Sequence, residues 1–344
     1  MNSNDLSSDA GLFLIKEFTC KLGFVKLLKS LFKTNDTALV RHHKDDENLW
    51  QVIYQILGAY FEDDCADELI HDPVLTTILD KKALASQPTL SRFFNRMDES
   101  TLNQFYVLMR RFRKVVYAIK RPQLLLPDLD STLLDTYGHQ EGEGFNFHYQ
   151  RHGYHPLVCY DGMTGDLRLT EATRNDMVSY AVCYGEFQYQ AESWKYPRRV
   201  VCKVEKPTDQ LIHMYTFIVT NMDSAPEELI RFYCKRGSME NFIKESKNGF
   251  DFTAVSSSSK IVNANRLQVH ALAYNIFNWF KRLVLPAKMR KQQIDTIRLK
   301  LLKIAAKAVH SARYITFKLC SSCPYKDEFY ETLENIRGLQ PQLE

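Results

Sequence analysis

Four polar side chains recur at helical spacing in one segment of this chain: Tyr233, Arg236, Glu240 and Lys247. An α-helix turns by about 100° per residue, so these offsets place all four side chains within an arc of roughly 60°. Such a face can bind a metal ion through the carboxylate and phosphate oxygens through the two cations. The alternative is an exposed ladder of ion pairs, in which Arg236 and Glu240 would stabilise the helix by only a few tenths of a kcal/mol.

Metal-dependent chemistry on a phosphodiester requires a second carboxylate, and Asp130 can supply it. Asp130 ends the apolar run of residues 124–130, which predicts a short strand, and Asp128 would point to the same side of that strand. Carboxylates from a strand and a helix can hold Mg²⁺ or Mn²⁺, which prefer oxygen ligands. Two such ions activate a water molecule or a 3′-hydroxyl and stabilise the leaving oxygen. Asp130 and Glu240 are therefore the candidate catalytic and metal-binding residues.

The spacing Tyr233-x2-Arg236-x3-Glu240-x6-Lys247 matches, at every position, the Y-(2)-R-(3)-E-(6)-K signature of DDE transposases from bacterial insertion sequences. The segment Asp130-Ser-Thr132 resembles the first catalytic strand of that family, in which small hydroxyl residues follow the aspartate. Other segments look like one subgroup of these enzymes, so the resemblance covers nearly the whole chain. These segments are residues 87–92, 129–142, 153–157 and 239–249.

The resemblance implies an enzyme of DNA transposition with an RNase H-like core between helical regions. Such an enzyme cuts double-stranded DNA at the terminal inverted repeats of its own element and joins the ends to target DNA. Asp130 would be the first metal-binding carboxylate and Glu240 the last. Tyr233, Arg236 and Lys247 would contact the transposon end. The family also implies Mg²⁺ (or Mn²⁺) as cofactor, a homodimer on DNA, and a place in the bacterial cytoplasm with the nucleoid.

The second aspartate of the family is missing from its expected context. The family places it at the end of a later strand, in a segment like Asp-Ser-Gly-Phe, and no such segment lies between Asp130 and Glu240. After Leu167 the chain soon reaches residues 184–194, which resemble the family again. We therefore expect an internal deletion near residues 167–172 that removes this aspartate and a central element of the sheet. The aspartates that remain in the interval are Asp135, Asp161, Asp166, Asp176, Asp209 and Asp223.

The expected deletion weakens the case for chemistry in this chain. Two carboxylates hold one Mg²⁺ weakly and do not fix two ions for in-line displacement. Whether Asp161, Asp166 or Asp176 takes the place of the second carboxylate stays open. The alternatives are a transposase impaired in cleavage and a non-catalytic DNA-binding protein derived from a transposase. A structural protein with a fortuitous Tyr-Arg-Glu-Lys face is a third, and it would show no salt-dependent DNA binding.

The elements that must position these residues fall into three regions. Apolar residues at helical spacing dominate both ends of the chain, whereas β-branched and alternating segments in the middle predict a sheet. The expected fold class is mixed, α+β or α/β, with an RNase H-like sheet core that the deletion leaves incomplete. The regions are an N-terminal helical region with a DNA-binding role at residues 1–121, the catalytic core at 122–260 with a β-rich insertion at about 184–220, and a C-terminal basic helical region at 261–344.

Local patterns refine this division. Apolar spacing predicts one helix over residues 11–32 and another over residues 225–249. In residues 84–97, Ser86 is placed to cap a helix with Pro88 in its first turn. This segment resembles a helix-turn-helix, and an ordinary helical hairpin fits the same pattern.

The charge distribution, rather than the total charge, points to an anionic partner. The 344 residues carry 45 Lys+Arg against 41 Asp+Glu, a net charge of +4. Residues 281–318 contain eleven Lys or Arg and a single acid, Asp295, and residues 110–121 are basic without any acid. This imbalance favours a nucleic acid over a merely solvated face. No apolar run approaches the roughly 20 residues of a membrane span, so no membrane partner is expected.

Aromatic and basic residues also meet in the β-rich insertion. Trp194 can stack on a base, and Arg198 lies four positions further on, so both are candidate DNA-binding residues. Other chemistry is disfavoured, because the sequence contains no P-loop and no G-x-S-x-G motif. Cys320-Ser-Ser-Cys323 has no second cysteine pair, and the clustered histidines have no partners at metal-ligand spacing.

Overall fold

The computed structural model has a mixed α+β fold, which is the class that the sequence predicted. Its residues group into two units: Met1–Arg121 with Tyr137–Glu141 and Glu245–Glu344, and Pro122–Thr136 with Gly142–Lys244. The predicted organisation in three domains stays a prediction. The structure describes residues 5–38, 40–146, 151–172, 182–205, 214–233, 237–253, 255–311 and 314–341.

The first unit is mainly helical. Its helices in the N-terminal half are separated by short connections, and its C-terminal half adds a long helix, a small sheet and a final helix. Helix α9 (Gly237–Phe250) begins in the second unit and ends in the first. The other elements of the first unit are β1 (Leu6–Ser7), α1 (Leu12–Lys21), α2 (Phe24–Leu31), α3 (Asp45–Leu57), α4 (Cys65–Glu68), α5 (Pro73–Leu79), α6 (Gln87–Asn95), α7 (Glu99–Ile119), α10 (Lys260–Leu283), α11 (Ile294–Ile297), the π-helical turn Arg298–Leu302, β11 (Ala306–His310), β12 (Ile315–Leu319) and α12 (Lys326–Arg337).

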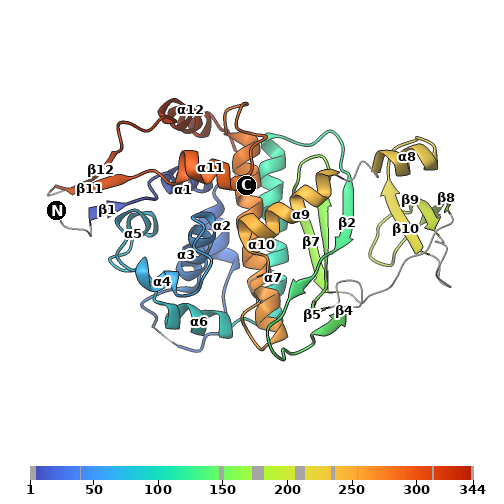
Figure 1. The fold of residues 1–344 in the computed structure, drawn as a ribbon, viewed down its shortest axis with the longest axis horizontal. Coiled ribbons are helices and arrows are strands. Elements are labelled where there is room, and N and C mark those ends of the chain that lie inside the picture. Colours follow the sequence, from blue (N-terminus) through green and yellow to red (C-terminus); the bar gives the residue numbers. More distant parts are fainter. Residues whose placement is uncertain are drawn as a thin grey trace. The chain divides into compact units, whose positions relative to one another are not determined.

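Helix α10 forms the centre of the first unit's core. It packs against α3 and α7, and Figure 1 shows α7 and α10 side by side. Trp279 is fully buried and meets Phe24 edge-on, while Phe24 stacks on Phe112 with ring centroids 4.0 Å apart. Burying a phenylalanine in this way stabilises the fold by about 1.5–3 kcal/mol. A buried hydrogen bond also links α7 to α10, since the Thr101 hydroxyl donates to Asn265 Oδ1 at 2.9 Å.

The single helix predicted for residues 11–32 is wrong, because two helices occupy this segment. Helix α1 ends at Lys21 and α2 begins at Phe24. Gly23 between them has φ 70°, a left-handed conformation that costs other residues free energy and that glycine adopts readily. The apolar spacing continues across this break because both helices bury their apolar residues in the same core.

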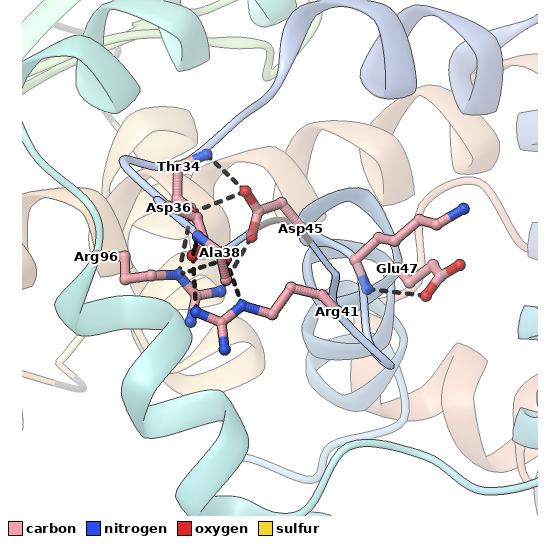
Figure 2. A network of polar contacts seen from close by, with 8 residues as sticks. Thr34, Asp36, Ala38, Arg41, Asp45, Glu47 and Arg96 are labelled. Atoms are coloured by element: carbon pink, nitrogen blue, oxygen red, sulfur yellow. Dashed lines mark hydrogen bonds and ion pairs between the residues drawn. The ribbon is translucent and has the colours of Figure 1, made fainter.

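A polar network fixes the connection between α2 and α3 (Figure 2). The backbone N–H and the hydroxyl of Thr34 donate to Asp45 at 2.7 Å and 2.8 Å. The guanidinium of Arg41 reaches both carboxylate oxygens of Asp36, each at 2.7 Å, and this holds the pKa of Asp36 well below its usual range. Arg96, the residue that caps α6 at its C-terminal end, contacts Asp45 at 3.1 Å. The network therefore ties this connection to α6.

Helix α6 begins where the sequence predicted, but its surroundings favour the helical hairpin over a helix-turn-helix. Ser86 is the N-cap residue and Pro88 lies in the first turn. The connection from α5 spans residues 80–86, which is longer than the roughly three- or four-residue turn of a helix-turn-helix. The Gln51 side chain fixes this connection by exchanging two 2.8 Å hydrogen bonds with the backbone of Ala85.

The C-terminal region contains strands where the sequence predicted helices alone. Strands β11 and β12 form an antiparallel hairpin, and β1 pairs with the other edge of β11. The register places Lys307 directly opposite Lys318. Alanine and lysine have low β propensity, so the strand Ala306–His310 carries little signal in the sequence. A tertiary contact supports it instead, because Phe317 packs on Phe13 of α1 with ring centroids 4.8 Å apart.

Among its described residues, the second unit contains three small antiparallel sheets and the helix α8 (Pro226–Tyr233). In the first sheet β6 lies between β2 and β7, and in the second β5 lies between β3 and β4. The third has β9 between β8 and β10, where the sequence predicted β-rich structure, and its status as an insertion stays a prediction. The strands are β2 (Pro127–Ser131), β3 (Leu134–Asp135), β4 (Gly144–Asn146), β5 (Arg151–Tyr154), β6 (Pro156–Asp161), β7 (Leu167–Ala172), β8 (Val182–Tyr189), β9 (Arg198–Glu205) and β10 (Met214–Thr220).

Candidate catalytic and DNA-binding site

Strand β2 positions the first candidate carboxylate. Asp130 lies opposite Val158 of β6, and its Oδ1 accepts a 2.9 Å hydrogen bond from the backbone N–H of Ser131. Side chains two positions apart on a strand share a face, so Asp128 points to the same side as Asp130. Asp128 is buried, whereas Asp130 is half-buried and reachable from solvent. The sequence therefore identified the strand that carries Asp130, and the catalytic role of Asp130 stays a prediction.

Asp161, one of the aspartates that could supply a second carboxylate, belongs to the turn between β6 and β7 in this structure. It ends β6 opposite Pro127, three positions along the sheet from the pair that contains Asp130, which is roughly 10 Å on a strand. Its Oδ1 accepts backbone hydrogen bonds from Met163 and Thr164 at 3.0 Å and 3.3 Å. A fully buried carboxylate used in this way stabilises the turn between β6 and β7.

The two other candidates for the second carboxylate are Asp166 and Asp176. Asp166 is fully buried, and its backbone carbonyl accepts a 2.9 Å hydrogen bond from the N–H of Asp161, so it belongs to the same turn. Asp176 lies outside the described residues.

Helix α9 carries Glu240 and is anchored to the sheet by Phe242. The Phe242 ring stacks on Tyr160 with centroids 6.0 Å apart, and Tyr160 lies opposite Asp128 on β2. Gly165, at φ 70°, provides room for this ring, because a Cβ at that position would lie 2.9 Å from Phe242 Cε1. Glu240 itself is exposed in the first turn of α9. Phe242 and Gly165 are positioning residues that the sequence pattern alone did not single out.

The four residues of the Tyr-Arg-Glu-Lys pattern do not all lie in one described helix. Tyr233 is the last residue of α8, and Arg236 lies outside the described residues. Glu240 and the half-buried Lys247 both lie in α9, seven residues apart, which puts them on the same face of the helix. The single helix expected over residues 225–249 is thus described as two segments, and the common face of all four residues stays a prediction.

The structure brings Trp194 and Arg198 together. The half-buried Trp194 lies between β8 and β9, and the exposed Arg198 places its guanidinium carbon 5.2 Å from the indole centroid. Tyr189 also contacts Trp194, with its ring centroid 5.7 Å from that of the indole. A cation held over an aromatic ring is attracted by the ring's quadrupole, so the two candidate residues form one local group.

Part of the basic charge in the C-terminal region serves the fold. Lys281 pairs with Glu245, Lys288 with Glu328, and Lys303 with Asp9. Arg298 is buried and donates hydrogen bonds to the carbonyls of Leu57, Ile56 and Gly249, while burial lowers its pKa. The excess of basic residues at 281–318 is therefore weaker evidence for a nucleic acid than the sequence suggested.

The described residues do not complete a metal site. Within them, no group of three or more His, Cys, Asp and Glu side chains is placed to hold a metal ion. In the part of the chain described, the donor set around Asp130 and Glu240 thus does not fit a two-metal centre. None of the described helices is both long enough and apolar enough to cross a membrane.

The candidate site thus combines the strand that carries Asp130, the helix that carries Glu240 and rests on the sheet of that strand, and the group of Trp194 and Arg198. The family model "Transposase DDE domain group 1" matches this chain in two segments, residues 1–181 and 167–341. The chain therefore belongs to the DDE transposase family. Neither a curated protein nor a solved structure matches it. Membership implies DNA transposition, DNA binding, an RNase H-like fold and, in general, the use of Mg²⁺.

Proposed function

We propose that this chain is a transposase relative that binds the ends of its element as double-stranded DNA and is impaired in strand cleavage. Asp130 and Glu240 are the surviving first and last carboxylates, which hold Mg²⁺ or Mn²⁺ weakly. A non-catalytic DNA-binding protein derived from a transposase is the limiting case, in which cleavage is lost altogether. A homodimer on DNA is part of the proposal, because transposition brings two ends together.

The observation that carries this proposal is the family match in two segments. The segments overlap at residues 167–181, next to the stretch where the sequence pattern breaks off. A match that breaks off and starts again supports the loss of a segment between the two halves. The second aspartate would have been lost with that segment.

The sheet that carries Asp130 supports the same proposal. Within the described residues this sheet has three strands, and β2 lies at its edge with Leu129 45 % exposed. An unpaired edge and an exposed apolar side chain are what the loss of a neighbouring strand would leave.

The DNA-contacting residues of the proposal come from two places. Tyr233, Arg236 and Lys247 match the family signature, and they would contact the transposon end. Trp194 and Arg198 form the aromatic–cation group at the start of β9. Arginine binds phosphate bidentately and lysine binds it as a point charge, so both suit a DNA backbone.

The test compares DNA binding with DNA cleavage by the purified chain, using duplexes that carry the sequences flanking its own reading frame. We expect binding that weakens steeply with salt, and cleavage in Mg²⁺ or Mn²⁺ no greater than that of Asp130→Asn. Arg236→Ala and Lys247→Ala should each weaken binding, while Lys326→Ala, an exposed lysine of α12, serves as the matched control.

Two results would contradict the proposal. Robust Mg²⁺-dependent cleavage that Asp130→Asn abolishes would mean that the active site is complete. DNA binding that does not depend on salt, or no DNA binding at all, would favour the alternative that the chain is a structural protein.

A further inference from the structure

The sheet β8–β9–β10 exposes a row of aromatic side chains on one of its faces. Its other face is packed in the usual way, since Val201 and Ile218 are buried against Leu229 and Ile230 of α8. Four rings on the opposite side are exposed, from 43 % for Phe187 to 59 % for Tyr215. The aromatic face, as we call it, consists of Phe187, Tyr189, Trp194, Tyr215 and Phe217.

The rings of the aromatic face form one continuous row. Tyr215 and Phe217 are parallel with centroids 6.1 Å apart, and Phe217 meets Phe187 edge-on at 6.1 Å. The row continues from Phe187 to Tyr189 at 6.5 Å and from Tyr189 to Trp194 at 5.7 Å. The row thus crosses the sheet from β10 to the loop after β8, with a near-constant spacing between neighbouring rings.

The strand register explains why the rings are accessible. Cys202 of β9 lies opposite Phe217, and Gly185 of β8 lies opposite Cys202, so the sheet positions across from that ring carry small side chains. Val200 lies opposite Phe187 and is 3 % exposed, so it forms the floor beneath the rings. Val200 is covered, whereas the aromatic rings are exposed to solvent. An ordinary hydrophobic core would bury the rings as well.

The charge of the aromatic face suits an anion. Successive strand residues alternate between faces, which places Arg198 on this face and Glu186 and Lys203 on the other. Arg198 is the single charged side chain among the described strand positions that share the face. Lys195 adds a second cation next to Trp194 in the loop, 5.4 Å from the Tyr196 ring.

We propose that the aromatic face binds single-stranded DNA, with successive bases stacked on its rings and with Arg198 on a phosphate. Stacking on aromatic side chains tolerates any base sequence, and a cationic group next to the rings holds the backbone. A closed duplex hides the faces of its bases, so this surface selects an unpaired strand. The inference rests on the proposed function, which places Trp194 and Arg198 on DNA, and it deepens that function by naming the form of DNA bound there.

Tryptophan fluorescence of the full chain provides a direct test. Of the three tryptophans, Trp50 and Trp279 are 4 % and 0 % exposed, so Trp194 is the one that added DNA can reach. We expect an oligothymidylate of about 15 nucleotides, near the upper end of known site sizes per domain, to quench this emission. The quenching should disappear in Trp194→Phe, which keeps a ring at that position.

Binding of the same labelled oligothymidylate, followed by fluorescence anisotropy, tests the rest of the row. Phe187→Leu and Phe217→Leu keep an apolar side chain and remove the ring, and each should weaken binding by about five- to a hundred-fold. Tyr330→Leu, which removes a ring that is 51 % exposed on α12, is the matched control and should change nothing. Circular dichroism checks that each variant is folded.

The duplex that carries the flanking sequences separates the two proposals. If the chain binds this duplex but oligothymidylate neither quenches Trp194 nor responds to Phe187→Leu and Phe217→Leu, the inference is overturned and the proposed function stands. If oligothymidylate binds with unchanged affinity to both variants, other groups bind it and the inference fails. If Phe217→Leu instead dissociates a dimer, the face joins two copies of this chain, which also overturns the inference. If the chain binds neither the duplex nor oligothymidylate, both proposals are contradicted.

Discussion

His270 is a histidine inside α10 whose protonation affects stability. It is 5 % exposed, and its Nδ1 lies 2.6 Å from the carbonyl oxygen of Phe250, which accepts the hydrogen bond. Burial lowers the pKa of His270, and the hydrogen bond to Phe250 and the charge of Asp251 oppose this only in part. The unfolded chain therefore binds a proton that the folded chain does not, once the pH falls below about 6.5.

We expect the free energy of unfolding to decrease when the pH is lowered from about 7.5 to about 5.5, because protonation then favours the unfolded state. His270→Gln removes the titrating group and keeps a donor for the carbonyl, so its stability should change less over this range. Urea unfolding at the two pH values gives the comparison, with the exposed His310→Gln as control. Equal pH dependence of His270→Gln and the unmodified chain would show that other groups are responsible.

Gly165 determines how closely α9 can approach the turn between β6 and β7. Gly165→Ala introduces a left-handed alanine, which costs about 1–2 kcal/mol, and a contact of 2.9 Å with Phe242. Gly138 has nearly the same φ, 72°, and no atom within 4 Å of a built Cβ. We expect urea unfolding to show a larger loss of stability for Gly165→Ala than for Gly138→Ala. The difference should shrink when Phe242→Leu is added, since the two positions are coupled.

At the scale of elements, the sequence predicted those features that local pattern controls. The helices around Trp50, Phe112 and Trp279 and the strand before Asp130 all lie within their predicted regions. Elements that tertiary contacts create were not predicted, such as β11 and β12, which are supported by packing on α1. The candidate site shows the same limit: spacing selected Asp130 and Glu240, whereas Phe242 is found through the ring contacts that seat its helix.

The hairpin of β11 and β12 places two like charges directly opposite each other. Lys307 and Lys318 are both exposed, and neither has an ion pair with a residue that the structure describes. Like charges in this position destabilise a sheet by a fraction of a kcal/mol. We expect Lys307→Thr and Lys318→Thr each to stabilise the chain by a few tenths of a kcal/mol in thermal unfolding at low salt.

A double-mutant cycle isolates the repulsion from the better β propensity of threonine. Either substitution alone relieves the repulsion, so the double variant should gain less than the sum of the two. High salt screens the repulsion and should remove this difference. Strict additivity at both salt concentrations would mean that the pair contributes nothing.

At the scale of the whole molecule, the net charge of +4 does not distinguish two populations of basic residues, those held in ion pairs and those without one to a described residue. Lys281, Lys288 and Lys303 are held in ion pairs within the first unit. Arg110 and Arg111 on α7 are exposed and make no ion pair with the described residues. Neutralising a phosphate releases condensed counterions, so side chains that are still free should dominate the salt dependence of DNA binding.

The salt dependence of duplex binding tests this distinction. Each phosphate contact contributes about 0.9 to the slope of log affinity against log salt, so Arg110→Gln and Arg111→Gln should each reduce that slope by nearly one. Lys288→Gln breaks the 2.7 Å pair with Glu328, so it should leave the slope unchanged while lowering stability slightly. If Lys288→Gln reduces the slope as much as Arg110→Gln does, paired lysines of this surface also reach phosphate, and the two populations of basic residues are one.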